Sequence, residues 1–252
     1  MKNTLKDQIK NGERVLGGFV GMYSPNLVEM IGYAGFDFIV IDDEHAAFSY
    51  TELENLIRTA ENVGLVPLVR VSYDPSSIQK ALDRGAKGIQ VPMVNTKEDA
   101  ENVIAQAKFP PFGNRGVAFS HRAARYGMDS GEAFIDSSNE EILVIPHIET
   151  VEATENFEEI MSVAGIDIAF IGSTDLSVNM GFKKEGAKHP DVQKRIARLY
   201  ETAQKNNYTI GTVAGDSTSV KDAFDKGAKY VSVVTNTVIF EGLKNLVRQG
   251  ES

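Results

Sequence analysis

The stretch AGFDFIVIDDEH, residues 34–45, holds three signals in succession. Gly35 stands where a left-handed helix cap is needed, a conformation that glycine adopts without steric cost. The apolar, β-rich run 36–41 follows it and indicates a strand. Asp42, Glu44 and His45 then end the run within one short turn. The stretch therefore predicts a helix end, a strand and a polar turn able to carry chemistry.

The same helix-to-strand joint recurs with Gly85, Gly165 and Gly227 in the place of Gly35. Short apolar runs alternate with longer amphipathic segments along the chain, a pattern typical of βα units and a parallel sheet. Eight strands are expected, at Leu16–Met22, Phe36–Asp42, Val66–Val71, Gly88–Pro92, Ile142–Ile148, Ile166–Ile171, Tyr208–Val213 and Tyr230–Thr235. Helices are expected at Pro25–Ala34, Tyr50–Val63, Pro75–Arg84, Lys97–Ala107, Val151–Val163, Asp191–Asn206, Ser217–Lys226 and after Asn236.

Eight βα units in 252 residues favour a closed (β/α)8 TIM barrel over an open doubly wound sheet. No Gly-x-Gly-x-x-Gly follows the first strand, which argues against a dinucleotide site. We expect a single domain over residues 1–252, interrupted by an irregular segment near 108–127 that is rich in proline and glycine. A loop of that length in a compact domain is usually functional, so we expect it to act as an active-site loop or lid.

The composition excludes several chemistries. With no cysteine there is no disulfide framework, cysteine protease, iron–sulfur cluster or cysteine-based zinc site. The 26 basic and 35 acidic residues give a net charge of −9, which argues against a nucleic-acid partner. No apolar run approaches the ~20 residues that cross a bilayer. Residues 1–12 lack the apolar core of a signal peptide, so the expected location is the cytoplasm.

Unusual polar residues fall at the carboxyl ends of the predicted strands, which is where barrel enzymes place their active sites. Glu149 and Asp175 follow the neighbouring fifth and sixth strands, so their carboxylates are candidate ligands for one cation. An all-oxygen site of this kind suits Mg²⁺ or Mn²⁺. The alternative is that each acid merely complements the start of a helix.

Arg70 ends the third strand, where a guanidinium is able to hold a carboxylate or to stabilise an enolate oxygen. The alternative is a structural salt bridge. His45 is a candidate general base, oriented by Asp83 or by a carboxylate of the second strand, or else a surface histidine. Lys87 and Lys229 precede their strands, so metal-assisted enolate chemistry is favoured over a Schiff base.

Several motifs taken together resemble the class II pyruvate aldolases, the HpcH/HpaI aldolase family. They are AGFD to DDEH (34–45), VR (69–70), VPMV (91–94), PPFGNRG (110–116), IET (148–150) and FIGSTDLS (170–177), and the likeness runs from about Leu5 to Leu246. The resemblance implies a barrel of the phosphoenolpyruvate/pyruvate superfamily that uses a divalent metal (Mg²⁺, Mn²⁺ or Co²⁺). It also implies a homohexamer whose last helix packs on a neighbouring subunit, and cleavage of a 4-hydroxy-2-oxo acid into pyruvate and an aldehyde, in aromatic or sugar-acid catabolism.

The resemblance also implies roles for individual residues. Glu149 and Asp175 match the metal ligands, Arg70 the group that binds the pyruvate oxygen, and His45 with Asp83 the base and its partner. Gly172 and Ser173, with Thr174 beside them, match the turn that holds the pyruvate carboxylate. The aldehyde half is expected near Phe19, Val117, His121, Arg122, Arg125 and Thr212.

The sequence departs from the family pattern at several positions. Asp43 replaces a glycine, His147 stands where a glutamine is frequent, and Ser173-Thr174 replace Pro-Ala. His147 either hydrogen-bonds a ligand or fills the barrel interior. Two other functions compete with the aldolase: a citrate-synthase-like or citrate-lyase-like enzyme with the same metal-enolate site, and a protein that binds a 2-oxo acid without turnover.

Overall fold

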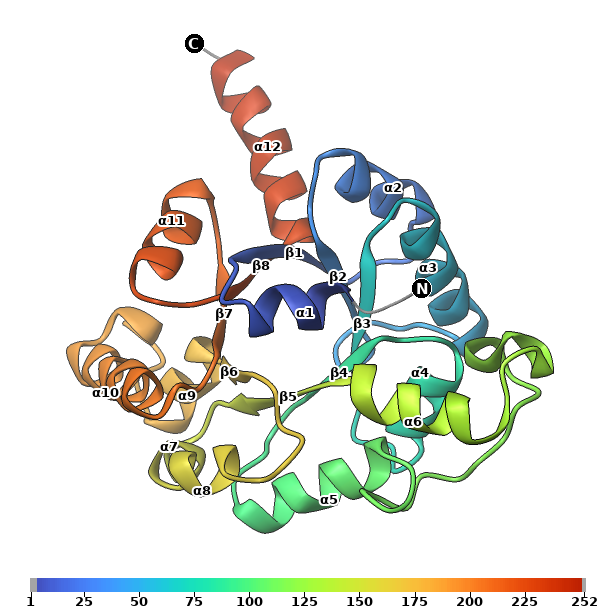
Figure 1. The fold of residues 1–252 in the computed structure, drawn as a ribbon. Coiled ribbons are helices and arrows are strands. Elements are labelled where there is room, and N and C mark those ends of the chain that lie inside the picture. Colours follow the sequence, from blue (N-terminus) through green and yellow to red (C-terminus); the bar gives the residue numbers. More distant parts are fainter. Residues whose placement is uncertain (1–3, 251–252) are drawn as a thin grey trace.

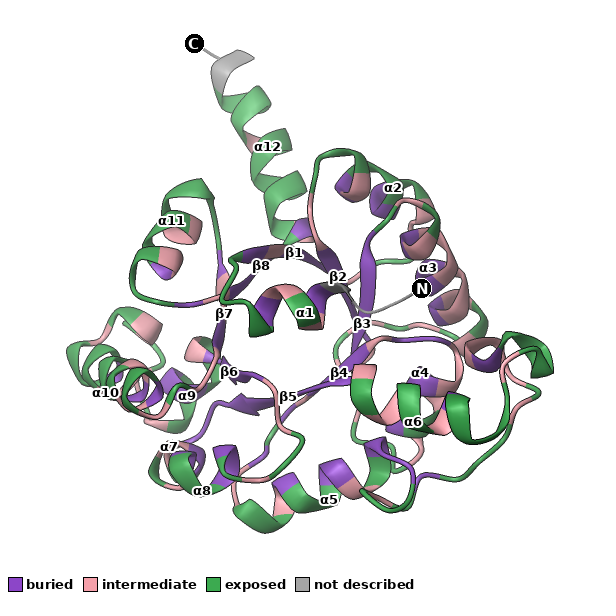
Figure 2. Cartoon of the chain, viewed as in Figure 1, coloured by how far each residue is buried: buried purple, intermediate pink, exposed green. Residues whose placement is uncertain are grey.

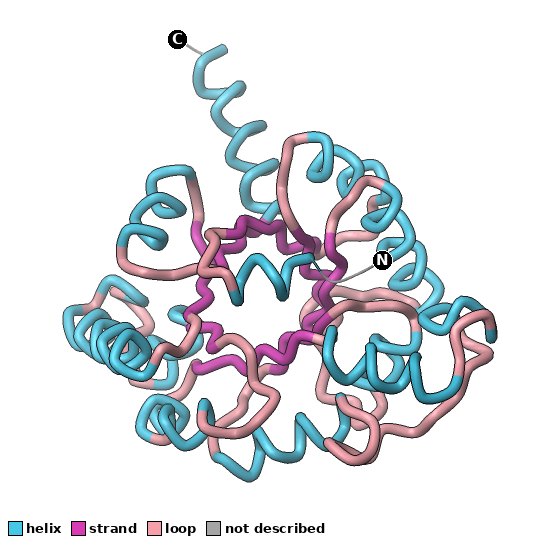
Figure 3. Tube along the Cα trace, viewed as in Figure 1, coloured by secondary structure: helices cyan, strands magenta, loops and turns pink. Residues whose placement is uncertain are grey.

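The computed structural model describes residues 4–250 and forms a closed barrel of eight parallel strands with helices around it (Figure 1). The strands are β1 (Val15–Val20), β2 (Phe38–Asp42), β3 (Val66–Arg70), β4 (Gly88–Val91), β5 (Leu143–Ile148), β6 (Ala169–Ile171), β7 (Ile210–Ala214) and β8 (Tyr230–Val234). They pair in chain order and β8 closes the ring on β1, as the magenta strands of Figure 3 show. The predicted (β/α)8 barrel and its eight strands are confirmed, while the predicted outermost bounds, residues 1–3 and 251–252, lie outside the described residues.

Four strands begin later than predicted, and at two of them, β2 and β6, an aspartate occupies the place of a ladder bond. The Asp37 carboxylate accepts the backbone N–H of Leu16 at 2.8 Å, and the Asp167 carboxylate accepts that of Val144 at 2.9 Å. Each aspartate lies two residues after the glycine of its helix-to-strand joint. Its side chain thereby bonds the start of β2 or β6 to the preceding strand, β1 or β5. The four joint glycines all have left-handed backbones, with φ of 88°, 103°, 99° and 106° at residues 35, 85, 165 and 227, as expected.

Helices follow the strands around the outside of the barrel, with insertions after the fourth and sixth units (Figure 1). Their bounds are α1 (Thr4–Lys10), α2 (Pro25–Tyr33), α3 (Tyr50–Asn62), α4 (Ser77–Asp83), α5 (Lys97–Ala107), α6 (Gly131–Glu141), α7 (Val151–Glu155), α8 (Phe157–Met161), α9 (Ser173–Asn179), α10 (Pro190–Asn206), α11 (Ser217–Asp225) and α12 (Thr235–Gly250). Three of them, α1, α6 and α9, were not predicted. The predicted helix Val151–Val163 is two helices, α7 and α8, separated at Asn156.

The core has two parts, one inside the barrel and one between the barrel and its helices, and the strands are buried throughout most of their length (Figure 2). Inside the barrel, Tyr230 is fully buried and its ring stacks on Phe38 at 4.2 Å between centroids. Gly17 makes room for this pair, because a Cβ there would lie 2.0 Å from the Phe38 ring. Leu5 and Ile9 of α1 close the amino-terminal end of the barrel, across which α1 lies in Figure 1.

The irregular segment 108–127 connects α5 to α6, and thus to β5, rather than following a strand. The Lys108 ammonium anchors it by donating to the carbonyls of Asn139 and Ile142, at 2.7 and 2.8 Å. Its last part, the 3₁₀ turn Arg122–Gly127, packs on α4 beside the barrel. In one copy of the chain this segment lies beside α4 and follows a helix, and its role as an active-site loop or lid stays a prediction.

The last helix, α12, leaves the barrel after its first turn and is exposed along most of its length (Figures 1 and 2). Its apolar side chains Phe240, Leu243, Leu246 and Val247 are 58–68% exposed, and together they form what we call the α12 apolar face. None of the helices in the described part of the chain combines the length and the hydropathy that crossing a membrane requires.

Candidate active site

An arginine–carboxylate cluster lies at the carboxyl ends of β2 and β3. The two strands pair so that Asp42 stands directly beside Arg70. The Arg70 guanidinium donates from Nε and Nη2 to the two Asp42 carboxylate oxygens at 2.9 and 2.7 Å, and its Nη1 lies 3.2 Å from Glu44. Such a fork-shaped pair fixes the plane of the guanidinium as well as its position. The Phe19 ring lies 5.0 Å from the same group.

The charge of Arg70 is held in place by its surroundings. Burial disfavours a charged guanidinium, but the bonds to Asp42 and the negative charges of Asp42, Glu44 and Glu149 outweigh it and raise the pKa of Arg70 above its ordinary value. The group therefore stays a cation in the barrel mouth. It offers fixed positive charge to an anionic substrate or to charge that develops during a reaction.

The turn after β2 is organised by the same aspartate. Asp42 Oδ1 accepts the backbone N–H groups of Glu44 and His45 at 3.3 and 3.2 Å, which is the pattern of an Asx turn. The His45 side chain is 65% exposed, and its Nε2 lies 3.7 Å from the Glu44 carboxylate. His45 is thus open to a ligand and next to Glu44 and Asp42.

Glu149 is a buried carboxylate that the barrel holds from both sides. Its Oε1 accepts the N–H of Met93 at 2.8 Å, and its Oε2 lies 3.2 Å from His147 Nδ1. Burial disfavours the carboxylate, but His147, the Met93 amide and Arg70 together lower the pKa of Glu149 below its ordinary value. A Cβ on Gly172 would lie 2.7 Å from Glu149 Oε2, so this glycine of the next strand end leaves space for the carboxylate.

Asp175 lies in the first turn of α9, three residues after Gly172, and is exposed. No donor among residues 4–250 contacts its carboxylate. The Tyr73 hydroxyl donates to Glu44 at 3.1 Å, and burial, followed by the negative charges of Glu44, Glu149 and Asp175, raises the pKa of Tyr73 to about 12. The described residues include no group of three or more His, Asp or Glu side chains that could hold a metal by itself.

Not every strand end carries charge. Phe19 and Val213 stand one residue before the ends of β1 and β7, Val234 ends β8, and all three side chains are apolar. The charged groups come from β2 and β3 and from the segments after β2, β5 and β6. One side of the mouth is therefore ionic and the other is apolar.

Some predicted site residues lie elsewhere in a single copy of the chain. Asp83 pairs with Arg115 at 2.7 Å and lies 3.5 Å from His121, and it does not contact His45. Arg122 pairs with Glu61 and donates to the carbonyl of Arg84 at 3.0 Å. Both positions follow from topology, because the helix carboxyl ends lie at the barrel end opposite the mouth. The roles of Asp83 and Arg122 in the reaction stay predictions without support from one chain.

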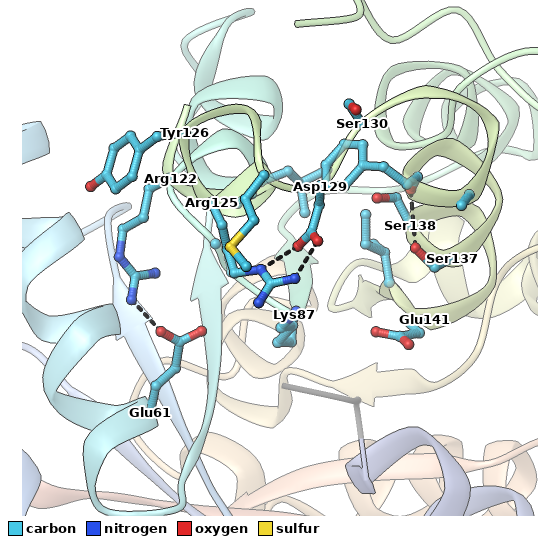
Figure 4. A pocket seen from close by; sticks show the side chains of 18 of the residues that line it. Glu61, Lys87, Arg122, Arg125, Tyr126, Asp129, Ser130, Ser137, Ser138 and Glu141 are labelled. Atoms are coloured by element: carbon cyan, nitrogen blue, oxygen red, sulfur yellow. Dashed lines mark hydrogen bonds and ion pairs between the residues drawn. The ribbon is translucent and has the colours of Figure 1, made fainter. Parts of the chain in front are cut away.

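Arg122 instead lines a cavity of about 1050 Å³ beside α6, shown in Figure 4. Residues just before β4 and β5, including Lys87 and Glu141, line it as well. Arg125 pairs there with Asp129, and the picture shows these two side chains facing each other. Arg122 and Arg125 are thus both paired with acids in this cavity, which residues before β4 and β5 line and not the strand ends that carry Arg70 and Glu149.

Sequence reasoning missed Met93, Tyr73 and the part that Asp42 plays. Met93 has a left-handed backbone, with φ of 56°, which aims its N–H at Glu149, and nothing in its residue type indicates this conformation. The pairing of Asp42 with Arg70 depends on the register of two strands. The only sequence signal for this pairing is that Asp42 and Arg70 each stand at the end of a predicted strand.

A (β/α)8 barrel with a fixed guanidinium and several carboxylates at its carboxyl-terminal mouth has its charged groups where barrel enzymes bind small-molecule substrates. The chain belongs to the HpcH/HpaI aldolase/citrate lyase family, whose model matches residues 16–240. The predicted family and the predicted class, a carbon–carbon lyase, are therefore confirmed.

The chain is similar to aldolases over almost its entire length. It is 33% identical over 238 residues to 2-dehydro-3,6-dideoxy-6-sulfogluconate aldolase of Pseudomonas putida, covering 94% of this chain and 92% of that one. It is also 33% identical over 241 residues to 4-hydroxy-2-oxo-heptane-1,7-dioate aldolase of Salmonella dublin, covering 95% and 90%. An HpcH/HpaI aldolase/citrate lyase family protein of Burkholderia cenocepacia J2315 superposes with a TM-score of 0.93 at 27% identity, covering 99% of this chain and all of the other.

Proposed function

We propose that this protein cleaves a 4-hydroxy-2-oxo acid, of the 2-keto-3-deoxy sugar acid or hydroxy-oxo-heptanedioate type, into pyruvate and an aldehyde. The names of the similar aldolases support this substrate class. The observation that carries the proposal is the fixed guanidinium of Arg70, which Asp42 and Glu44 hold in the mouth near Glu149.

Two carboxylates fit a divalent cation. Glu149 is ionised and oriented by two neighbours, and the Asp175 carboxylate has no donor among the described residues. Because two protein oxygens leave most positions of a hard cation to water and substrate, the site suits Mg²⁺, Mn²⁺ or Co²⁺ without a third protein ligand. Such a cation supplies Lewis-acid stabilisation of the negative charge that develops on the 2-oxo group.

The side chains of this protein would carry the remaining steps. The first amides of α9, at Ser173 and Thr174 after Gly172, have no intrahelical acceptor and would hold the substrate carboxylate. His45 would remove the proton of the 4-hydroxyl group. The C3–C4 bond then breaks, the aldehyde leaves, and the electron pair stays on the pyruvate fragment as an enolate. Arg70 would stabilise the enolate oxygen until C3 is protonated.

Phe19 is well placed to contact the part of the substrate beyond C4, since it lies one residue before the end of β1, on the apolar side of the mouth, and its ring is 5.0 Å from the Arg70 guanidinium. The citrate-synthase-like or citrate-lyase-like alternative uses the same enolate chemistry. The aldolase names of the similar sequences favour cleavage of the 2-oxo acid. Dependence of turnover on CoA would favour the alternative.

We also propose that α12 packs on a second copy of this chain. Its apolar face is exposed, and only its beginning contacts the barrel at β1 and β8. A helix that leaves its own barrel is able to cover the same region of a neighbour by reciprocal exchange, which builds a closed symmetric oligomer. The resemblance to the family implies that this oligomer is a hexamer.

The activity is tested by incubating the protein with a panel of 4-hydroxy-2-oxo acids, with and without EDTA, and coupling pyruvate release to lactate dehydrogenase. We expect pyruvate from at least one member of the panel, loss of activity with EDTA and recovery with Mg²⁺, Mn²⁺ or Co²⁺. Pyruvate formation that continues after complete metal removal would contradict the cation site. No pyruvate from any substrate with any of the metals would contradict the aldolase.

A further inference from the structure

Four buried polar side chains form a continuous chain across the barrel interior beneath the mouth. Tyr230 lies on β8 and Gln90 on β4, which stand on opposite sides of the closed barrel. The Tyr230 hydroxyl and Gln90 Nε2 are 2.8 Å apart, and Gln90 Oε1 and His147 Nε2 are also 2.8 Å apart. His147 Nδ1 then lies 3.2 Å from Glu149 Oε2. Tyr230 and Gln90 are 0% exposed, His147 is 1% exposed and Glu149 is 5% exposed.

Each hydrogen bond between Tyr230 and Glu149 needs one donor and one acceptor, and this requirement restricts how the four side chains are arranged. The oxygen and nitrogen of a glutamine amide exchange places when the amide turns by half a rotation, and they are assigned by their partners. As the amide stands, Gln90 Nε2 donates to the Tyr230 hydroxyl and Gln90 Oε1 faces His147 Nε2, so a neutral His147 that donates to Gln90 has no proton left for Glu149. With the Gln90 amide turned, Tyr230 donates its O–H to Gln90, Gln90 donates an N–H to His147 Nε2, and His147 donates Nδ1–H to Glu149. Each link then joins one donor to one acceptor. Burial raises the pKa of Tyr230 well above its ordinary value, so its hydroxyl keeps its proton and is able to donate it to a turned Gln90 amide.

The surroundings hold the two middle members of the chain in place. The His147 ring stacks on Phe170 with 4.7 Å between centroids, so it cannot swing out of line without losing this contact. On the other side of Glu149, the Met93 amide engages Oε1. One carboxylate oxygen is thus held by a strained backbone turn and the other by the chain from Tyr230.

We propose that Tyr230, Gln90 and His147 are positioning residues that hold Glu149 in its cation-binding orientation, with His147 in the Nδ1–H tautomer. The inference deepens the proposed function, because it rests on Glu149 as a ligand. Hydrogen bonds to a ligand carboxylate fix its rotamer, and losing such a partner typically costs about 10- to 100-fold in metal affinity. His147 therefore acts on Glu149, the proposed metal ligand, and does not merely fill the barrel interior.

The test measures Mn²⁺ binding by calorimetry at one pH, on protein stripped of metal. Tyr230→Phe removes one hydroxyl and keeps the ring that stacks on Phe38. We expect the dissociation constant for Mn²⁺ to rise by up to about tenfold, because Tyr230 acts on Glu149 only through Gln90 and His147. Tyr200→Phe is the matched control, since this half-buried tyrosine of α10 lies outside the barrel interior, and its affinity should equal that of the parent protein. Gln90→Met interrupts the same chain and replaces Tyr230→Phe if that variant does not fold.

Two further measurements separate positioning from simple packing. In the His147→Phe background, adding Tyr230→Phe should not weaken Mn²⁺ binding further, whereas His147→Gln should retain more affinity than His147→Phe because an amide N–H remains. Nitrogen NMR of ¹⁵N-histidine protein should show His147 protonated at Nδ1 and unprotonated at Nε2. In Tyr230→Phe the Nε2–H form should increase.

Unchanged Mn²⁺ affinity in Tyr230→Phe, with or without a lower melting temperature, would overturn the inference while leaving the cation site intact. Additive losses of Mn²⁺ affinity in the double variant would also overturn it. So would a proton on Nε2 and not on Nδ1 of His147 in the parent protein. If the parent protein binds no Mn²⁺, the proposed cation site itself fails and the positioning role fails with it.

Discussion

Asp42 and Arg70 end adjacent strands at the same level of the barrel and share two hydrogen bonds, of 2.9 and 2.7 Å. The pair joins the ladder between β2 and β3 to the site, because the register of the strands sets the plane of the guanidinium. It also links Arg70 to the turn that carries His45, since Asp42 accepts two amides of that turn.

Arg70→Lys tests whether this plane matters. Lysine keeps the positive charge but is unable to form a fork-shaped pair with Asp42. We expect kcat for pyruvate release to fall about 100-fold, comparable to the loss of one preorganised donor in an oxyanion site, and KM to change less. Arg58→Lys on α3, whose pair with Glu54 lies on the surface, is the control and should behave like the parent protein. Full activity of Arg70→Lys would mean that charge alone suffices.

Glu149→Gln and His45→Ala should fail in different ways. Removing one of two anionic ligands should weaken Mn²⁺ binding strongly, since glutamine is a neutral and poorer ligand. His45→Ala should bind Mn²⁺ like the parent protein but lose the cleavage step, by about 100-fold or more. Calorimetry with Mn²⁺ and the coupled pyruvate assay distinguish the two. The reverse pattern would exchange the proposed roles.

Gly172→Ala should displace Glu149. The new Cβ would lie 2.7 Å from both the Glu149 Cβ and its Oε2, an overpacking that we expect to cost about 1–3 kcal/mol of unfolding free energy. Mn²⁺ affinity should fall at the same time. Gly215→Ala, after β7, is the control, because a Cβ there meets nothing within 4 Å. Denaturant unfolding and calorimetry would refute the prediction if the two alanine variants behaved alike.

Lys108 should make stability depend on pH in the alkaline range. Burial, together with the positive charge of Lys6, lowers the pKa of Lys108 from 10.5 to about 8. Between these values the unfolded chain binds more protons than the folded one, so this lysine makes the protein more stable as pH rises from about 8 to 10.5. Below that range the penalty is fully present, and it amounts to about 3 kcal/mol.

Lys108→Met should remove this rise, although it also loses the bonds to Asn139 and Ile142. The relevant quantity is the difference between the parent protein and the variant in unfolding free energy, measured by urea at pH 7.5 and pH 10. We expect this difference to be larger at pH 10. An equal difference at both pH values would contradict the lowered pKa.

Polar substitutions on the α12 apolar face should change the assembly. Leu243→Ser with Val247→Ser introduces two hydroxyls into a face that is 58% and 62% exposed at these residues in one chain. If a second copy covers the face, light scattering should show a smaller oligomer at equal protein concentration. A control with Glu201→Ser on the exposed surface of α10 should keep the parent mass. An unchanged mass in the double variant would exclude α12 from the interface.

The strands were predictable because each combines a local signal, an apolar run, with a glycine joint or a polar end. The helices that were missed lack such signals. In α6, Phe134 alone is buried, and α9 begins directly at the end of β6. Helix α1 has its buried residues, Leu5 and Ile9, in a segment of only seven residues.

The site was predictable only in part, for a topological reason. Arg70, Glu149 and Asp175 follow strands, and strand ends meet at one mouth. Asp83 ends a helix, and Arg122 lies in a helix-to-strand connection, so both belong to the opposite end of the barrel. Contacts such as Met93 with Glu149, or His147 with Gln90, depend on tertiary packing between strands that are distant in sequence.

The separation of ionic and apolar strand ends has an evolutionary consequence. The residues proposed to break the bond and the apolar residues on the other side of the mouth lie in different stretches of the chain. Mutations at Val213 or Val234 would therefore change the apolar side of the mouth without altering Arg70, Glu149 or Asp175, whereas Phe19 also contacts Arg70. Related barrels would then change their substrate range through side chains near the ends of β7 and β8 and keep the same reaction.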